Sequence, residues 1–347
     1  MFDKLRRSGL ILAAALATTP QLGLAETLKL KLQTHFNPSL SVIGEASENL
    51  VKTIESIAGD DIKIRFYEAN KLAPTVDTFG AVRDGTIDAV IGWPGYFAGQ
   101  LPALTVFAAI PFGPRPEEYM TWMYEGEGSE LANEIFEEHG VHAVLCGLIP
   151  SEGGGWFREA LGSSDDLVGK KIRWSGTGGR VLQKMGASIS MVPAGEIFPN
   201  MERGVLDATE FSLPSVDRNL GLYKIAKHFY VPGWHSPYQS EFLMVNKDVW
   251  DGASDRQRAM IEVACQANVT WTYARGLGEQ AEAMAFYEQE GVQVHEWSKE
   301  DLAKFRETFN QLIEEEIAAD ESYANAYRSV ADYVESLRVW TSKSSVD

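Results

Sequence analysis

The chain is poor in cysteine and in basic residues, and it lacks long hydrophobic runs. Two cysteines among 347 residues cannot build a disulfide scaffold, and no CxxC pair or Cys/His cluster offers a zinc site. Lysine and arginine total 31 against 49 acidic residues, which gives a formal charge of −18. This charge excludes a nucleic-acid partner, because a phosphate backbone would repel the chain and no basic stripe offsets the repulsion.

The signatures of common enzymes are missing as well. The sequence contains no GxGxxG, Walker, GxSxG or HExxH pattern. The glycine loop 176–179 could offer backbone amides to an anion, but no phosphate-binding lysine follows it in register. We therefore predict that the protein is not an enzyme. A secreted acidic hydrolase, using one of the many carboxylate pairs, is the distant alternative.

The first 25 residues form an export signal rather than part of the fold. Residues 1–7 carry three basic side chains, an apolar run follows at 10–17, and small residues end the segment at Ala25. A basic start, a short apolar stretch and a small-residue exit are typical of a secretory signal. The apolar run is too short to cross a bilayer as a permanent helix. We expect cleavage after Ala25 and a soluble mature protein.

The two cysteines are expected to be buried. Cys146 ends the apolar run 141–146, which predicts a core strand. Free buried thiols at Cys146 and Cys265 are therefore the expectation. A disulfide between them, formed in an oxidising compartment, is the alternative.

Strand and helix patterns alternate along most of the chain. In the first half, strands are expected at 27–33, 62–66, 87–91 and 104–109, and helices at 41–57, 75–84 and 116–138. In the second half, strands are expected at 155–158, 171–174, 188–192, 207–211, 228–231 and 241–245, and helices at 179–185 and 194–203. Residues 255–339 are mostly helical, with a strand-like break at 292–295. This rhythm builds largely parallel sheets with helices on both faces.

The two halves share a local pattern, which predicts two lobes of one α/β class. Gly85 and Gly204 each follow a helix end and precede an Asp-Ala strand, where glycine suits the left-handed cap. We expect lobe 1 at 26–150 with a return segment at about 238–290, lobe 2 at 151–237, and a C-terminal helical segment at 298–340. In open α/β sheets the ligand binds at the carboxyl ends of the strands, here between the lobes.

An arginine and several aromatic side chains follow strands at this predicted edge. Arg173 ends a strand before a glycine loop, and its two-pronged guanidinium fits a carboxylate better than lysine does. The other candidates are acids and aromatic residues beside predicted strand ends or lobe crossings: Trp93, Tyr96, Glu152, Trp156, Glu210, Phe211 and His235. Aromatic walls around one arginine predict a site for a small organic anion.

These segments resemble the substrate-binding subunits of tripartite ATP-independent periplasmic (TRAP) transporters, the DctP-type family. The resemblance covers nearly all of residues 26–340 and is most specific at 154–158, 171–173, 195–199, 204–210 and 230–234, with 109–113 in addition. They are more similar to the branch that binds 2-oxo monocarboxylates such as pyruvate than to the sialic-acid or C4-dicarboxylate branches.

The resemblance implies a periplasmic protein whose two lobes close around a ligand, in the manner of a Venus flytrap. It implies that the ligand carboxylate pairs with Arg173 and that the protein delivers a small organic acid anion, a 2-oxo or 2-hydroxy monocarboxylate, to a small and a large membrane subunit. Sugar-acid, aromatic-acid or sulfonate ligands are the alternative within the family.

The resemblance also implies a Na⁺ or Ca²⁺ ion that bridges ligand and protein. Its ligands would come from Glu152, Glu210, the backbone of Phe211 and a further polar group after Trp234. For that last position Ser236, Gln239 and Glu241 compete, and Gln239 is the residue we select. The chain departs from the branch at three places: Phe211 stands where tryptophan is expected, Glu152 stands where glutamine is expected, and no single acid or amide after Trp234 is marked out. His235 could re-aim the pocket toward a larger or aromatic acid.

The C-terminal segment has more apolar positions than one short helix needs. They recur at helical spacing from Leu302 to Leu337, with a break at 318–322. This stripe either packs across the two lobes of its own chain or, as the resemblance allows, reaches a second subunit in a homodimer with exchanged helices.

Overall fold

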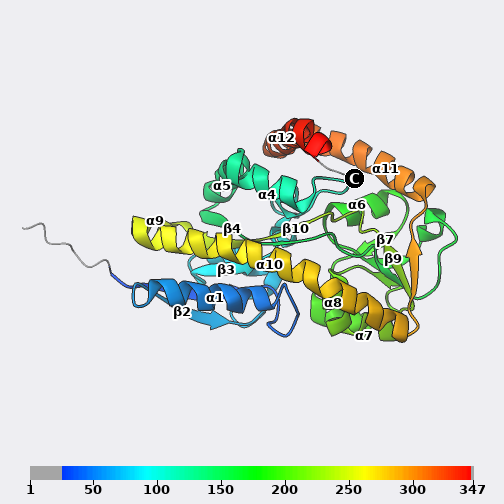
Figure 1. Ribbon diagram of the computed structural model, residues 1–347, viewed down its shortest axis with the longest axis horizontal. Coiled ribbons are helices and arrows are strands. Elements are labelled where there is room, and N and C mark those ends of the chain that lie inside the picture. Colours follow the sequence, from blue (N-terminus) through cyan, green and yellow to red (C-terminus); the bar gives the residue numbers. More distant parts are fainter. Residues whose placement is uncertain (1–25, 345–347) are drawn as a thin grey trace, which may run out of the picture.

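The computed structural model describes residues 26–344, so the expected signal segment 1–25 lies outside the described residues. The described chain folds into two α/β lobes, each built on one sheet, and ends in two long helices (Figure 1). The two-lobed α/β class expected from the sequence is confirmed. No helix between residues 26 and 344 combines the length and the apolar character that crossing a membrane requires.

Lobe 1 contains a five-stranded sheet in the order β2-β1-β3-β10-β4. β1 pairs in parallel with β2 and β3, and β10 runs antiparallel to both β3 and β4. The alternating residues of the first strand bury Leu30 and Leu32 and turn Lys29 and Lys31 outward. The strands are β1 (Leu28–Thr34), β2 (Ile62–Tyr67), β3 (Ala89–Gly92), β4 (Val141–Ile149) and β10 (Gln239–Asn246). The helices are α1 (Glu45–Ala58), α2 (Thr78–Arg83), α3 (Leu104–Ala108), α4 (Pro116–Glu125), α5 (Gly128–Glu138) and α9 (Lys247–Gly252).

Lobe 2 contains a six-stranded sheet in the order β11-β9-β5-β8-β6-β7. Its strands are short: β5 (Trp156–Phe157), β6 (Lys171–Arg173), β7 (Ser188–Ser190), β8 (Ala208–Thr209), β9 (His228–Val231) and β11 (Gln293–Glu296). Its helices are α6 (Gly176–Lys184), α7 (Ala194–Glu202) and α8 (Pro214–Leu220). The carboxyl ends of β6 and β8 therefore lead directly into Ser175 and Glu210, at the boundary with lobe 1.

A single helix, α10 (Asp255–Gln289), runs along both lobes (Figure 1). Its 35 residues would span about 52 Å at 1.5 Å per residue. Ser254 caps its start, accepting a hydrogen bond from the amide of Gln257 at 3.3 Å. It bonds to lobe 1 through Asn268, whose amide donates to the Cys146 carbonyl at 2.7 Å, and to lobe 2 through Gln280, which donates to Ser215 at 3.1 Å.

Cys146 and Cys265 form a disulfide that joins β4 to α10. The expectation of free thiols was wrong, because the sequence pattern showed burial but not that these two buried residues face each other. The bridge lies in an apolar cluster between the sheet and the helix, with Leu243, Val245 and Ile261 among its members.

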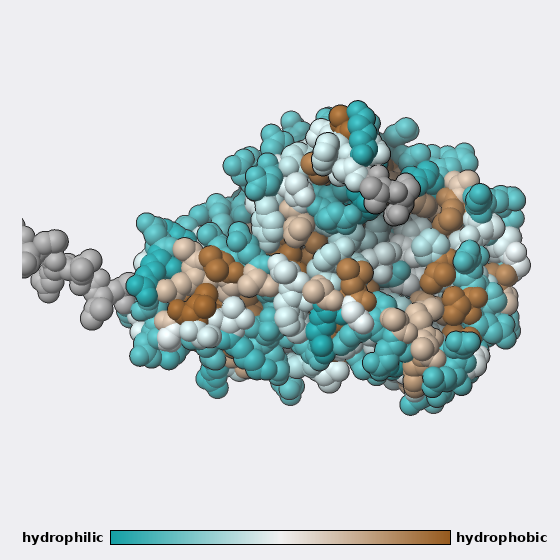
Figure 2. Space-filling model, viewed as in Figure 1, coloured by the Kyte–Doolittle hydropathy of each residue, from teal (hydrophilic) through white to brown (hydrophobic). Residues whose placement is uncertain are grey.

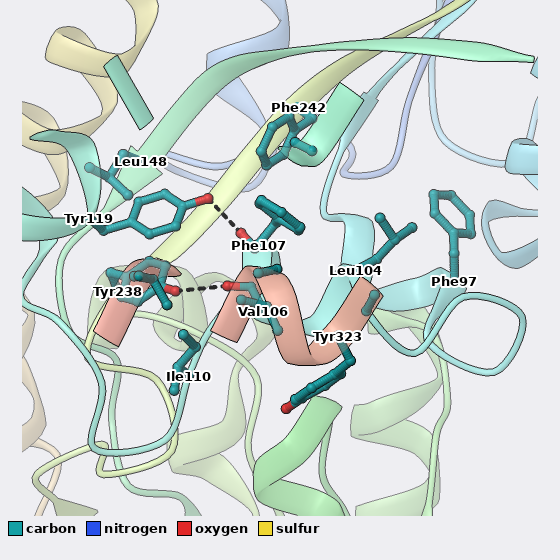
Figure 3. Packing of buried hydrophobic residues seen from close by; sticks show 14 of the residues in the cluster. Phe97, Leu104, Val106, Phe107, Ile110, Tyr119, Leu148, Tyr238, Phe242 and Tyr323 are labelled. Carbon is teal, nitrogen blue, oxygen red and sulfur yellow. Dashed lines mark hydrogen bonds between the residues drawn. The ribbon is translucent and has the colours of Figure 1, made fainter. Parts of the chain in front are cut away.

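Two further expectations about lobe 1 were wrong. The apolar run 104–109 forms helix α3 instead of a strand, and all five residues of that helix are buried, so no polar face marked it as helical. Tyr119 and Tyr238 donate hydrogen bonds to the carbonyls of Phe107 and Val106, at 2.8 and 3.2 Å (Figure 3). These buried hydroxyls satisfy helix-end carbonyls that have no partner within the helix.

The expected helix 116–138 is two helices, α4 and α5. The chain is extended at Gly126, where a β-carbon would lie 2.8 Å from the Trp122 carbonyl oxygen. A side chain at this position would collide with the preceding turn, so the glycine permits the break.

The C-terminal helices bridge the lobes. Helix α11 (Lys299–Ala319) packs on α6, with Lys184 and Glu315 paired at 2.7 Å. Helix α12 (Glu321–Ser344) packs on α4 and α5, where the Trp122 indole donates to Ser329 at 3.1 Å. On the face shown in Figure 2, apolar side chains reach the surface only as separate patches among hydrophilic ones.

Candidate functional site

A small cavity lies between the two lobes. Its volume of about 10 Å³ leaves room for about one water molecule. Lobe 1 contributes Trp93, Thr105, Ala108, Ala109 and Gln239. Lobe 2 contributes Ser175, Gly176, Thr177 and Gly178, and the two chain crossings between the lobes contribute Glu152, His235 and Ser236. A ligand can therefore enter only when the lobes separate.

The two crossing segments lie against each other, backbone to backbone. The amide of Glu152 donates to the Ser236 carbonyl at 3.1 Å, and the amide of Gly154 donates to the Tyr230 carbonyl at 2.7 Å. A β-carbon at Gly233 would lie 2.2 Å from the Glu152 carbonyl oxygen. This close approach explains the glycine in the second crossing and fixes Glu152 and His235 at the cavity.

Glu152 and His235 line this cavity, and Glu210 lies next to both of them. Glu210, Arg173 and Phe211 are not among the lining residues, so these three predicted site residues lie behind the cavity wall. One ligand atom from each lies within 4.8 Å of the others, and all three residues are buried. The His235 Nε2 atom is 3.7 Å from Glu152 Oε2 and 3.6 Å from Glu210 Oε1. At these distances the contacts are ion pairs rather than hydrogen bonds, so both imidazole nitrogens remain without a hydrogen-bond partner in the described chain.

Arg173 binds the Glu210 side chain and backbone. Its Nη1 donates to the carboxylate Oε2 of Glu210 at 3.1 Å and also to the Glu210 carbonyl. The carboxylate accepts two further hydrogen bonds from Ser175, from the amide at 3.2 Å and the hydroxyl at 3.0 Å. The guanidinium lies 5.3 Å from the centre of the Phe211 ring. Arg173 is only 2% exposed, so its charge acts in a desolvated environment.

The three titratable groups of the cavity have shifted pKa values. Burial raises the pKa of Glu152, and the neighbouring Glu210 charge raises it further. Burial also opposes ionisation of Glu210, but contact with His235 and the charge of Arg173 outweigh it, so the pKa of Glu210 is lowered. Burial favours neutral His235, yet the two carboxylates prevail and raise its pKa to about 9. His235 is therefore the counter-ion of two acids.

The unsatisfied oxygens suit a hard cation. Glu152 Oε1 and Glu210 Oε1 are buried and have no hydrogen-bond partner among residues 26–344. Na⁺ and Ca²⁺ prefer carboxylate, carbonyl and amide oxygens, which Glu152, Glu210 and Gln239 can provide. Gln239 and Ser236 line the cavity, whereas Glu241 does not. The donor set therefore fits the bridging ion that the resemblance implies.

The other predicted site residues occupy different places. Trp93 lines the cavity, and its ring packs at right angles to Tyr96, 5.2 Å between centres. Tyr96 lines an adjoining groove that shares Thr105 and Gly176 with the cavity. Trp156 is fully buried in the lobe 2 core, where its indole donates to Asp217 at 2.7 Å, so the structure places it away from the cavity lining.

Sequence reasoning missed two contributors, Ser175 and Met191. Ser175 follows the strand β6 and holds the Glu210 carboxylate, and the position of a serine just before a glycine loop was the available signal. Met191 contacts Arg173, with its sulfur 3.6 Å from Nη2, although nothing in its local pattern marks it.

Two lobes closed over a buried arginine, two carboxylates and an imidazole define a protein that encloses a small charged solute. Residues 33–320 match the profile of the family described as bacterial extracellular solute-binding protein, family 7 (DctP), and the chain belongs to this family. The resemblance to TRAP-transporter binding proteins is thus confirmed. The family binds solutes and is not a catalytic one.

Known relatives are similar over most of their length. The monocarboxylate 2-oxoacid-binding periplasmic protein of Nostoc sp. strain PCC 7120 is 27% identical over 295 residues, which cover 85% of this chain and 81% of that protein. A TRAP solute-binding protein of Bordetella bronchiseptica, a mixed-occupancy dimer with calcium and picolinate, is 26% identical with a TM-score of 0.89, covering 92% of this chain and 95% of that one.

A third relative carries a different ion. The TRAP solute-binding protein of Pseudoalteromonas atlantica, solved with sodium and pyruvate, is 28% identical with a TM-score of 0.87, covering 92% of this chain and 97% of that one. Homologous structures therefore hold sodium or calcium together with a carboxylate ligand.

Proposed function

We propose that this chain captures a 2-oxo or 2-hydroxy monocarboxylate together with a bridging Na⁺ or Ca²⁺ ion and delivers it to a membrane permease, without catalysing a reaction. The observation that carries the proposal is the cluster of Glu152, Glu210 and His235 beside the cavity, with Arg173 bound to Glu210 behind it. The arginine would pair with the ligand carboxylate, and the two acids would hold the ion. The relatives that bind pyruvate or 2-oxo acids support this assignment.

The cation solves a charge problem. An anionic ligand beside two buried carboxylates would be repelled, because only Arg173 and His235 balance those acids. A cation bound to Glu152 and Glu210 would supply the missing positive charge. The backbone carbonyl of Phe211 and the Gln239 amide are the further ligands that we assign.

The proposal is tested by calorimetric titration of metal-depleted protein with pyruvate and with lactate. We expect binding in the presence of Ca²⁺ or Na⁺ and its loss after exhaustive chelation in sodium-free buffer. Glu210→Gln should lose the ion dependence together with most of the affinity, whereas Glu159→Gln, an exposed site outside the cavity, should bind as the parent does. Equal affinity with and without cations would overturn the ion assignment, and conversion of the acid to a product would overturn the non-enzymatic one.

An aromatic acid is the second candidate ligand. The groove that adjoins the cavity has a volume of about 510 Å³ and is lined by Tyr96, Trp174, Ile189 and Met191. A larger side chain could extend into it past Thr105 and Gly176, which line both spaces. Phenylpyruvate and picolinate in the same titration decide this point, since tighter binding than pyruvate would favour the aromatic class.

We further propose that residues 1–25 direct export and that the mature protein works in the periplasm with one small and one large membrane subunit. The proposal includes the division of the chain into three parts: lobe 1 (26–150 with 238–290), lobe 2 (151–237) and the C-terminal segment (298–340). The family assignment and the basic, apolar and small-residue order of the first segment support it.

A further inference from the structure

Four cations form a compact grid on lobe 1. Strands β1 and β2 pair in parallel, with Lys29 opposite Lys63 and Lys31 opposite Arg65. All four side chains point away from the core, on the face opposite Leu30 and Leu32. They line a shallow groove of about 390 Å³, in which Asp88 is the one acidic lining residue.

This arrangement costs stability and is unusual in so acidic a chain. Like charges directly opposite each other on neighbouring strands are destabilising. Lys31 lies 3.6 Å from Asp88, and Lys63 lies 2.9 Å from the exposed Asp60. Lys29 and Arg65 have no ion-pair partner within residues 26–344, and Arg65 instead lies 5.1 Å from the Tyr67 ring centre. The grid therefore carries excess positive charge where 49 acids could have neutralised it.

Protection of the sheet edge does not account for these cations. Lysine on an edge strand blocks unwanted strand pairing, and β2 is the edge strand of its sheet. Lys31, however, lies on β1, and its backbone is bonded on the side away from β2 by Asp88, whose amide donates to the Lys31 carbonyl at 3.2 Å and whose carboxylate accepts from the Lys31 amide at 2.7 Å. A cation at a residue whose backbone is already bonded there gives no edge protection, so at least this member of the grid needs another explanation.

The outer edge of β2 is open to a partner. This strand lies at the lower margin of the molecule in Figure 1, and over residues 26–344 its backbone has hydrogen bonds to β1 alone. An edge strand presents unpaired N–H and C=O groups that an extended segment can use. Side chains on one face of an added strand would alternate in register with Lys63 and Arg65.

We propose that this basic face docks an extended segment of a partner protein, with acidic residues at alternate positions, that adds as a strand beside β2. Its carboxylates would face Lys63 and Arg65, and Lys29 and Lys31 would add attraction from the neighbouring strand. A narrow segment contacts the grid alone. An anionic membrane, by contrast, would also meet the rest of a chain whose formal charge is −18 and be repelled by it.

The test uses calorimetry with the mature protein and a synthetic peptide, acetyl-Thr-Glu-Val-Asp-Val-Glu-Thr-amide. We expect binding at low salt that weakens at least tenfold in about 0.3 M salt. Lys29→Glu/Arg65→Glu should weaken binding at least tenfold, and Lys29→Gln/Arg65→Gln should do so in part. The charge-matched control is Lys224→Glu/Lys343→Glu, at exposed positions on lobe 2 and α12, which should bind as the parent does.

Two further measurements separate the docking mode from simple attraction. A peptide with N-methyl groups at alternate residues keeps its charge but cannot form the ladder, so it should lose binding. Vesicles with phosphatidylglycerol should not bind. The proposal would be overturned by retained affinity for the N-methylated peptide. It would equally be overturned if the control variant lost as much affinity as the grid variants, or if the protein bound vesicles but not the peptide. The Lys29/Arg65 variants should still bind the organic acid as the parent does. Failure of peptide docking can then be told apart from failure of the proposed function.

Discussion

Arg173 serves two buried partners, which sets the effect of its removal. Its guanidinium fixes the Glu210 carboxylate, and in the proposed complex it would also meet the ligand. Arg173→Ala should weaken acid binding by about 2 kcal/mol or more, because charge-assisted hydrogen bonds in a desolvated cleft are lost. Arg173→Lys should lose most of the affinity, since an ammonium cannot reproduce the fork.

Calorimetry checks this prediction against Arg203→Ala, an exposed arginine on lobe 2. The control should bind normally. If Arg173→Ala binds the acid as tightly as the parent does, the residue does not belong to the ligand site.

Glu241 makes the stability of the fold depend on pH. Both carboxylate oxygens are buried without a hydrogen-bond partner in the described chain, and burial raises the pKa to about 8. The folded state therefore holds a proton that the unfolded chain releases near pH 4.5, and stability falls as pH rises from about 4.5 to about 8. Glu241→Gln should remove this decline and stabilise the protein at pH 8, by a few kcal/mol at most.

Thermal unfolding from pH 4.5 to 9 measures the effect, with Glu159→Gln as an exposed control. Parallel curves for the parent and Glu241→Gln would contradict it. If the stability of the parent rose over this pH range relative to the variant, the predicted direction of the pH effect would be wrong.

At the residue level, the sequence predicted that charged side chains gather near the boundary of the lobes, and their role in binding stays a prediction. Arg173 ends β6 and Glu210 follows β8, and such positions converge in open α/β sheets, whereas Glu152 lies in the segment that crosses between the lobes. Trp156 was assigned to the ligand site, but its side chain lies on the core face of β5. There its indole donates a hydrogen bond to Asp217, a contact that the sequence did not predict. Which face of a two-residue strand is buried depends on its neighbours, and no local pattern encodes it.

At the level of elements, the disulfide fixes α10 to lobe 1. It closes a loop of 119 residues between β4 and the helix. Cys146→Ser/Cys265→Ser should lower the free energy of unfolding by up to about 4 to 5 kcal/mol, because the unfolded chain regains the entropy of that loop.

Denaturant unfolding with and without dithiothreitol tests this. Reductant should destabilise the parent but leave the double variant unchanged. A double variant as stable as the oxidised parent would show that the bridge contributes nothing to the fold.

Local pattern identified most elements but failed where tertiary contacts decide. The alternating strands β1 and β2 were located within one or two residues. Helix α3 was assigned as a strand because a fully buried helix has no amphipathic period, and tyrosine hydroxyls from distant segments satisfy its carbonyls.

At the scale of the whole molecule, the C-terminal helices bury most of their apolar stripe within one chain. Tyr323, Val330 and Val334 of α12 lie in the core cluster that both lobes share, whereas Val339 and Trp340 near its end are exposed. We therefore expect sedimentation at micromolar concentration to give the mass of a single mature chain.

A doubled mass would contradict this expectation. If that mass fell to one chain after deletion of residues 321–347, helix exchange between two subunits would explain the dimer. The Bordetella bronchiseptica relative is a dimer, which makes this test worthwhile.

The cleft between the lobes carries its own optical reporter. A β-carbon at Gly176 would lie 3.6 Å from the Trp93 ring, so in the closed state this lobe 1 indole rests against the first turn of α6 in lobe 2. Trp93 is only 6% exposed. Separation of the lobes would bring the indole into water, and its emission would then shift to longer wavelength. Opening and closing of this protein can thus be followed by intrinsic fluorescence in real time, with no label attached.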